Sequence, residues 1–324
     1  MSVSSEAKSA VEKLVAPPLA PLDSAFMEAK TATAGNFLRD FAYLTKPRLS
    51  SLVLLSTAAG FILGNTGSID YTLLIHTLCG TTLVAFGSSM LNQVLERKTD
   101  RLMERTKNRP LAAMRIDPGT VLYAGAAFSI IGLLQLAKCV NLNAALWAAV
   151  TLALYVFLYT PLKRVTTLNT LVGAIPGALP PLIGWAAAQT DGTGLNLQAW
   201  SLFMIMFIWQ LPHFLAIAWI YRKDYASAGL QMWPTLDPDG VVTGRQTVVQ
   251  SMLLVPVSLV PYYTHLSGPL YFAGALVLSL AFLCFGIHFA MCRTDRSARL
   301  LFLASVVYLP ALLGLMMATQ LRGA

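Results

Sequence analysis

A stripe of polar side chains is the part of this sequence best suited to chemistry. Asn92, Glu96 and Asp100 follow one another at four-residue intervals, where an apolar stretch that begins near Tyr71 gives way to charged residues. On an α-helix a four-residue step turns the chain by only about 40°, so the side chains form one line. Carboxylates at the membrane end of a spanning helix are costly unless a cation compensates them, so we expect a hard divalent ion such as Mg2+ here.

Basic and aromatic residues follow the second, fourth and sixth apolar stretches. Arg and Lys beside metal-binding acids suit a diphosphate, because a metal bridges its oxygens and guanidinium groups neutralise the remaining charge. A polyanion held against a membrane indicates a lipid diphosphate. The alternative is that these bases only anchor cytoplasmic loops and pair with neighbouring acids. The candidate residues, with one further acid, are Arg105, Arg109, Tyr159, Lys163, Arg164, Arg222, Lys223, Asp224 and Tyr225.

Membrane helices are the elements that must position these residues. Hydrophobic residues make up 56% of the 324-residue chain and charged residues only 12%. Apolar stretches long enough to span a bilayer recur through the chain, so we expect an all-α polytopic bundle of about nine transmembrane helices. Residues 1–36 read as a flexible polar extension and 37–324 as one intramembrane domain. The predicted spans are residues 49–66, 71–92, 118–138, 142–160, 168–188, 197–220, 246–264, 268–290 and 298–318.

The distribution of basic residues predicts the topology. If the N-terminus is cytoplasmic, 21 of the 23 Lys and Arg residues fall on the cytoplasmic side, and only Lys138 and Arg322 fall outside. Such an excess is typical of cytoplasmic loops. We therefore expect the C-terminus outside and the active site toward the cytoplasm. The net charge of +8 then reflects topology, and no nucleic-acid partner is expected.

The N-terminal segment favours a bacterial plasma (inner) membrane as the location. It lacks the continuous apolar core of a secretory signal, and its acids, including Glu6, Glu12 and Asp23, are unusual in a mitochondrial transit peptide. The four cysteines are scattered without the spacing of a zinc site or a disulfide framework, so we interpret them as small hydrophobic residues.

Three blocks of motif residues occur in order between Leu44 and the C-terminus. The first is Asn92-x3-Glu96-x3-Asp100-x2-Met103-x-Arg105-Thr106-x2-Arg109-Pro110-Leu111. The second is Tyr159-Thr160-x2-Lys163-Arg164-x4-Asn169-Thr170-x2-Gly173-x3-Gly177-Ala178-x-Pro180-Pro181-x2-Gly184-Trp185. The third is Trp209-Gln210-x-Pro212-His213-Phe214, followed by Tyr221-Arg222-x-Asp224-Tyr225-x2-Ala228-Gly229-x2-Met232. Together they resemble the UbiA superfamily of intramembrane prenyltransferases, and within it the protoheme IX farnesyltransferases.

This resemblance implies a Mg2+-dependent transfer of a farnesyl group from farnesyl diphosphate to a vinyl carbon of heme b. Water then adds a hydroxyl group, and the product is heme O. The implied metal ligands are Asn92, Glu96, Asp100 and Asp224. The residues implied to bind diphosphate or substrate are Arg105, Arg109, Tyr159, Lys163, Arg164, Asn169, Arg222, Lys223 and Tyr225. A downstream heme A synthase or oxidase assembly factor is an expected partner, beside heme b, farnesyl diphosphate and the lipid bilayer.

Two positions depart from the broad superfamily. Many members carry Asp where this chain has Glu96, which keeps the charge on a longer arm. The later motif is elsewhere rich in Asp, whereas Asp224 here stands alone between Lys223 and Tyr225.

His213 is the residue expected to meet the heme. It lies inside the sixth span, where it could bind the heme iron, position the quenching water or contact a propionate. A buried histidine with one interhelical hydrogen bond is the structural alternative. Gly173, Pro176 and Pro180 should break the fifth span, giving kinked packing or room for the macrocycle.

Two other functions remain open. An aromatic prenyltransferase of quinone or chlorophyll synthesis would share the first motif, although the blocks around Trp209 and Asp224 argue against it. A transporter should place its charges near the midplane between internal repeats, and we find no such repeats.

Overall fold

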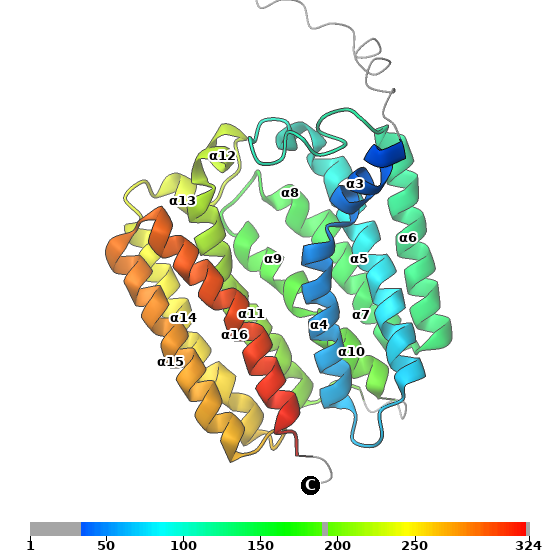
Figure 1. Cartoon of the computed structure of the whole chain (residues 1–324), viewed down its shortest axis with the longest axis vertical. Coiled ribbons are helices and arrows are strands. Elements are labelled where there is room, and N and C mark those ends of the chain that lie inside the picture. The colour runs from blue at the N-terminus through cyan, green and yellow to red at the C-terminus, as the bar shows by residue number, and fades with distance from the viewer. Residues whose placement is uncertain (1–33, 190–193, 322–324) are drawn as a thin grey trace, which may run out of the picture.

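The computed structural model describes residues 34–189 and 194–321. Most of the predicted extension, residues 1–33, lies outside the described residues. Residues 34–36, the end of the predicted extension, belong to α3 (Ala34–Thr45). This short helix packs against α5 (Tyr71–Asp100) at one end of the molecule (Figure 1).

Helices form the whole described architecture, with no strand longer than a single bridge between Ser267 and Gln320. The long helices run alternately up and down, and the short elements α8, α12 and α13 lie at the same end as α3 (Figure 1). The remaining elements are α4 (Pro47–Gly64), α6 (Pro118–Cys139), α7 (Leu142–Ala153), the π-helix η1 (Leu154–Tyr159), α8 (Thr160–Leu162), α9 (Asn169–Ala178), α10 (Pro180–Ala188), α11 (Leu197–Ile220), α12 (Arg222–Ser227), α13 (Trp233–Leu236), α14 (Val241–Tyr263), α15 (Pro269–Cys292) and α16 (Asp295–Ala318).

The predicted membrane bundle is confirmed in its class. Among the described residues, seven helical segments are long and apolar enough to cross a membrane, or eight if α3 and α4 count as one span bent by 52°. The other long helix, α14, carries Arg245, Gln246 and Gln250 and is not among them. The count of nine spans and the orientation of the termini therefore stay predictions.

Capping residues fix where several spans begin. Helices α5, α6, α7 and α11 begin at the predicted residues 71, 118, 142 and 197. In each, the preceding side chain accepts a hydrogen bond from a backbone N–H of the first turn, at 2.8–3.0 Å. The capping residues are Asp70, Asp117, Asn141 and Asn196.

Two spans are irregular beside the site. The fifth breaks at Leu179 between α9 and α10, where Pro180 opens the new helix, as the Gly and Pro pattern predicts. The fourth passes through the π-turn η1, an irregularity often found at functional sites. Neither interruption ends its span, because Asn169–Ala188 and Leu142–Leu162 each still cross the bundle.

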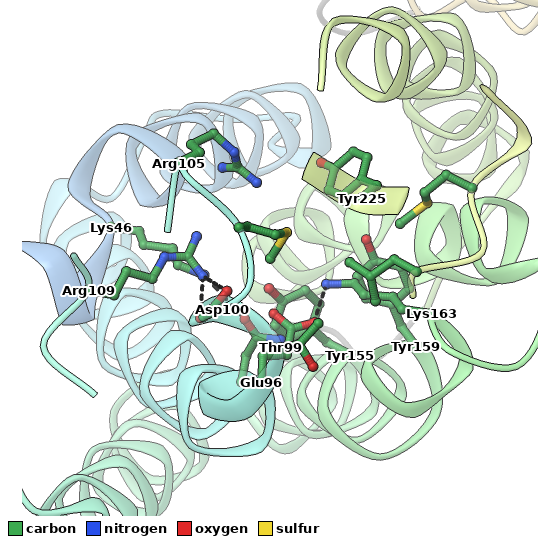
Figure 2. Close-up of a pocket in the computed structure, with 14 residues that line it drawn as sticks. Lys46, Glu96, Thr99, Asp100, Arg105, Arg109, Tyr155, Tyr159, Lys163 and Tyr225 are labelled. Carbon is green, nitrogen blue, oxygen red and sulfur yellow. Dashed lines mark hydrogen bonds and ion pairs between the residues drawn. The ribbon is translucent and has the colours of Figure 1, made fainter. Parts of the chain in front are cut away.

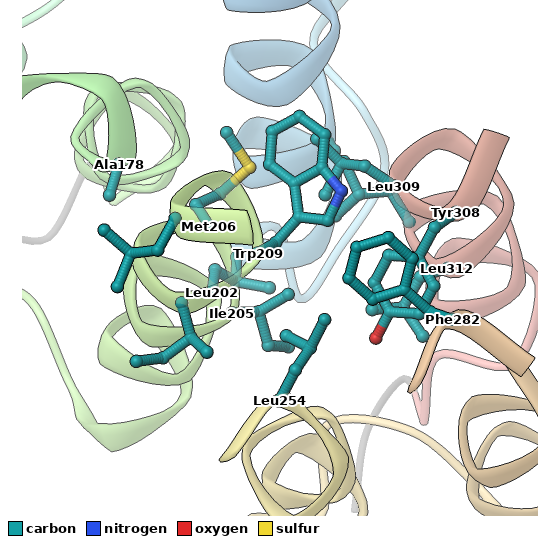
Figure 3. Close-up of a cluster of buried hydrophobic side chains, with 14 of the residues drawn as sticks. Ala178, Leu202, Ile205, Met206, Trp209, Leu254, Phe282, Tyr308, Leu309 and Leu312 are labelled. Carbon is teal, nitrogen blue, oxygen red and sulfur yellow. The ribbon is translucent and has the colours of Figure 1, made fainter. Parts of the chain in front are cut away.

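The main hydrophobic core lies between α11 and the C-terminal helices (Figure 3). Trp209 is its central aromatic residue, and its indole Nε1 donates to the Ser305 carbonyl of α16 at 2.9 Å. Tyr308 closes the other side of this core, hydrogen-bonding Ser258 and Ser279. These contacts fix α11, which carries His213, against α16.

Candidate active site

A polar cavity of about 110 Å³ opens at the end of the bundle where the short elements lie. Acids from α5 lie between bases on two sides (Figure 2). Its lining residues are Lys46, Asn92, Glu96, Thr99, Asp100, Met103, Arg105, Arg109, Tyr155, Tyr159, Lys163, Tyr225, Leu230 and Met232. The residues of the first motif that were predicted to share a site therefore do so.

The predicted stripe lines this cavity from one helix. Helix α5 continues about two turns beyond the predicted end at residue 92, so Asn92, Glu96 and Asp100 all project from regular helix. Asn92 is 1% exposed and is fixed at both ends of its amide. Its Oδ1 accepts from Lys46 Nζ at 3.2 Å, and its Nδ2 donates to Thr160 Oγ1 at 3.1 Å.

Each acid of the stripe is paired with a base from another segment. Arg109 Nη1 donates to both Asp100 oxygens, at 2.9 and 2.7 Å, and Lys163 Nζ donates to Glu96 Oε1 at 2.7 Å. The Lys163 ammonium also lies 4.4 Å from the centroid of the Tyr159 ring. Burial by itself lowers the pKa of Lys163, but Glu96 together with Tyr159 and Tyr155 holds that pKa above its ordinary value.

The segment between α5 and α6 is folded back so that its arginines reach the cavity. Thr106 Oγ1 donates to the Asp100 carbonyl at 2.9 Å, and Arg101 Nε donates to the Ala112 carbonyl at 2.9 Å. At the far end of this segment, Arg115 pairs with Asp40 of α3 at 2.7 Å. These contacts hold the loop in place, so that Arg105 and Arg109 line the same cavity as Glu96 and Asp100.

Tyr225 and Asp224 reach the cavity in different ways. Tyr225 lines it, and burial raises the pKa of its phenol. Asp224 is not a lining residue, and its Oδ2 accepts from the backbone N–H of Arg105 at 3.3 Å. Asp224 therefore holds the Arg105 loop against α12, and the structure does not bring it together with the acids of α5.

Four predicted substrate-binding residues lie outside the cavity lining. Arg164 donates to Thr99 Oγ1, and the buried Asn169 donates to the carbonyls of Thr166 and Gln231. Arg222 pairs with Asp295 at 2.6 Å. Lys223 is exposed. The first two tie lining segments together, whereas Arg222 connects α12 to α16.

The donor set of the cavity fits Mg2+ in part. Within the described ranges no group of three or more His, Cys, Asp or Glu side chains is close enough to hold a metal. Two carboxylates and one amide oxygen do line one wall. Mg2+ is usually bound by one or two carboxylates together with substrate phosphates and water, so Glu96 and Asp100, with Asn92, suffice for a metal that arrives with a diphosphate.

A second, apolar chamber of about 260 Å³ lies next to the polar cavity. Tyr155 and Tyr159 line both spaces, so the two tyrosines of η1 form the boundary between them. Their ring centroids lie 5.6 Å apart. The π-turn places both residues on the same side of the helix, and the chamber continues between α4, α5, α9 and α11.

His213 lines this apolar chamber from α11, as its predicted role requires. Its Nδ1 lies 2.6 Å from Ser305 Oγ, and the rings of Trp209 and Phe302 are each centred 5.1 Å from the imidazole. The side chain is partly buried. The interhelical hydrogen bond of the structural alternative is therefore present, together with access to the chamber.

Lys46 is the charged lining residue that the sequence analysis did not select. It was counted only among the 21 basic residues predicted to lie on the cytoplasmic side, yet it enters the cavity beside Asn92. It caps α4 with φ of 47°, directly before Pro47. A Lys-Pro pair at the start of a span was the available signal, because proline is favoured at the first position of a helix and so marks the preceding lysine as a helix-end residue.

A family model and similar sequences both relate this chain to prenyltransferases. The family model described as "UbiA prenyltransferase family" matches residues 53–317. A protein named protoheme IX farnesyltransferase from Solibacter usitatus is 48% identical over 289 residues, covering 86% of this chain and 98% of that protein. One of the same name from Salinibacter ruber is 44% identical over 280 residues, covering 86% and 98%.

Solved structures share the fold at low sequence identity. A digeranylgeranylglyceryl phosphate synthase has a TM-score of 0.69 at 14% identity, covering 87% of this chain and 98% of its own. A UbiA homolog from Archaeoglobus fulgidus bound to GPP and Mg2+ has a TM-score of 0.63 at 16% identity, covering 86% and 100%. At these identities the likeness concerns the arrangement of helices.

Proposed function

The chain belongs to the UbiA prenyltransferase family, and we propose that its polar cavity binds the diphosphate of farnesyl diphosphate while its apolar chamber receives heme b. The resemblance inferred from the three motif blocks is confirmed. The protein transfers the farnesyl group to the vinyl group of heme b, and the product is heme O. The observation that carries the site assignment is the junction of an acid-and-base cavity with an apolar chamber at Tyr155 and Tyr159.

Ionisation of the allylic C–O bond is the step that the polar cavity favours. Negative charge develops on the leaving diphosphate, and prepositioned cations stabilise it more in the transition state than in the ground state. Arg105, Arg109, Lys163 and Lys46 already line the cavity. Their present partners include Asp100, Glu96 and Asn92. These bases bind the diphosphate oxygens when the substrate enters.

Asn92, Glu96 and Asp100 would hold Mg2+ in this proposal. The metal would neutralise part of the leaving-group charge as a Lewis acid. Lys163 and Arg109, now paired with these acids, would then be able to bind phosphate oxygens. Asp224 contributes indirectly, because it holds the backbone of Arg105.

The apolar chamber protects the allylic cation after ionisation. Bulk water would quench it, and a chamber lined mainly by apolar side chains excludes water and solvates the isoprenoid tail. The vinyl group of heme b then supplies the electrons for the new C–C bond. The positive charge moves to the carbon next to the porphyrin, where one water adds as hydroxyl and gives its other proton to the released diphosphate.

The membrane setting completes the proposal. The chain is a multi-pass membrane protein, and we place it in the bacterial plasma membrane with the polar cavity toward the cytoplasm. A heme A synthase or an oxidase assembly factor would receive the product there.

Product analysis after expression in a host that lacks heme O tests the function. The heme extracted from the host should include a species with the mass of heme O only when the host expresses this protein. Parallel assays of purified protein with heme b and with 4-hydroxybenzoate separate the two prenyltransferase classes. Prenylation of the aromatic acid, without heme O, would contradict the proposal.

A further inference from the structure

Ser305 of α16 anchors two residues of α11 that lie one turn apart. Its carbonyl accepts from Trp209 Nε1 at 2.9 Å, and its hydroxyl oxygen lies 2.6 Å from His213 Nδ1. Ser305 is fully buried and does not line the apolar chamber. The imidazole is thus attached at one nitrogen to the wall behind it, and its ring is packed against Trp209 and Phe302.

The hydrogen bonds of Ser305 determine the tautomer of His213. The Ser305 hydroxyl oxygen lies 2.5 Å from the Phe302 carbonyl oxygen. Two oxygens this close must be joined by a hydrogen bond, with one hydrogen between them. The carbonyl can only accept, and the hydroxyl has a single proton to donate. His213 Nδ1 must therefore carry a hydrogen and donate it to Ser305. This leaves Nε2 without a proton.

Nε2 is the ring nitrogen that remains for the chamber. His213 lines the chamber, and Nδ1 is directed to a residue that does not. An imidazole whose one N–H donates to an oxygen while the other nitrogen presents a lone pair is the usual arrangement of a metal-binding histidine. A porphyrin iron can accept this lone pair in an apolar space.

From this geometry we infer that His213 binds the iron of heme b through Nε2, with Ser305 as the residue that positions it. The inference rests on the proposed function, because it concerns the substrate of the same chamber. Of the three roles left open for His213, iron binding is the one that this geometry favours. Ser305 lies on α16, outside the motif blocks. Iron ligation would fix the distance of the macrocycle from α11 and leave its vinyl edge to meet the farnesyl cation.

Titration of purified protein with ferric heme b, in detergent and without farnesyl diphosphate, tests the inference. Absorption and electron paramagnetic resonance should show a nitrogen ligand on the iron. His213→Ala should lose this signature, and added imidazole should restore it. Ser305→Ala should weaken heme affinity by about 10-fold or more, as loss of such supporting hydrogen bonds does in metal sites. Ser305→Thr, which keeps the hydroxyl, should bind as the wild type does.

Two matched variants serve as controls. His288→Ala removes an exposed histidine of α15, and Ser279→Ala removes a buried hydroxyl that bonds Ala275 and Tyr308. Both should retain the wild-type heme spectrum. An unchanged spectrum and affinity in His213→Ala would overturn the inference, as would a Ser305→Ala protein that is less stable but spectrally normal. Failure of the wild type to form heme O would overturn the proposed function alone, because ligation is measured without turnover.

Discussion

The Lys163 ammonium forms a 2.7 Å ion pair with Glu96 and lies over the ring of Tyr159 at the junction of the two cavities. This places a positive charge next to the boundary where the allylic bond should break. The side chains of both members of the pair are mostly buried, at 13% and 16% exposure, so the interaction is weakly screened. In the proposed complex, Glu96 would hold the metal and Lys163 would bind a phosphate oxygen in place of this pair.

Replacing Lys163 with methionine tests its proposed contribution to diphosphate departure. We expect Lys163→Met to lower kcat by about 100-fold, the usual effect of removing one prepositioned group that stabilises developing charge. The measurement is heme O formation per folded protein. Lys138→Met, at an exposed lysine near the end of α6, is the matched control and should keep full activity. Equal rates for the two variants would exclude the role of Lys163.

Lys46 should act mainly on substrate affinity. Its ammonium reaches the cavity beside Asn92, and a hydrogen bond to a charged group contributes about 1.5–3 kcal/mol. We expect Lys46→Met to raise the KM for farnesyl diphosphate by roughly 10-fold or more, with a smaller change in the KM for heme b. Lys107→Met, at an exposed lysine paired with Glu104, provides the control. If Lys46→Met raised the KM for both substrates equally, the change would reflect a general disturbance of the fold and would contradict the assignment.

Metal removal should stop the reaction. Exhaustive chelation is expected to abolish heme O formation, and added Mg2+ should restore it, because the cavity acids would otherwise remain paired with bases. Asp100→Asn should then need about 10-fold more Mg2+ for half of its maximal rate. The check is a Mg2+ titration of wild type and variant. Full activity after chelation would refute the assignment of the α5 acids to a metal.

The sequence predicted that Asn92, Glu96 and Asp100 lie together because their spacing is a local property of one helix, whereas the prediction that Asp224 joins them was wrong. A four-residue repeat places Asn92, Glu96 and Asp100 on one face whatever packs around them. The predicted starts of α5, α6, α7 and α11 agree with the structure for a similar reason, because each apolar stretch begins directly after a polar capping residue. Neither inference needs knowledge of contacts between distant segments.

Contacts between distant segments account for what the sequence could not predict. Arg222 lies in a basic motif next to Asp224, but Asp295 of α16 pairs with it, so Arg222 does not line the cavity. The π-turn of η1 has no periodic signature and depends on packing against α9. Lys46 enters the site because Pro47 starts α4 and Asn92 lies opposite, a relationship across 46 residues.

Gly173 should control the position of Tyr159, and thereby the junction of the two cavities. A Cβ built on Gly173 of α9 would overlap the Tyr159 ring, so Gly173→Ala must displace the ring that supports Lys163. Overpacking of this kind costs about 1–3 kcal/mol of stability, whereas a misplacement of about 1 Å at a reacting site can cost 10²-fold in rate.

We therefore expect Gly173→Ala to remain folded while its rate falls by about 10- to 100-fold. Heme O formation and thermal unfolding in detergent should be measured on the same preparation. Gly314→Ala is the matched control, because a Cβ at this helical glycine of α16 meets nothing within 4 Å. That change should leave the rate unaltered and stabilise the helix by up to about 1 kcal/mol. If Gly173→Ala instead lost stability but turned over normally once folded, Tyr159 would not need its present position, and the junction would not be where ionisation occurs.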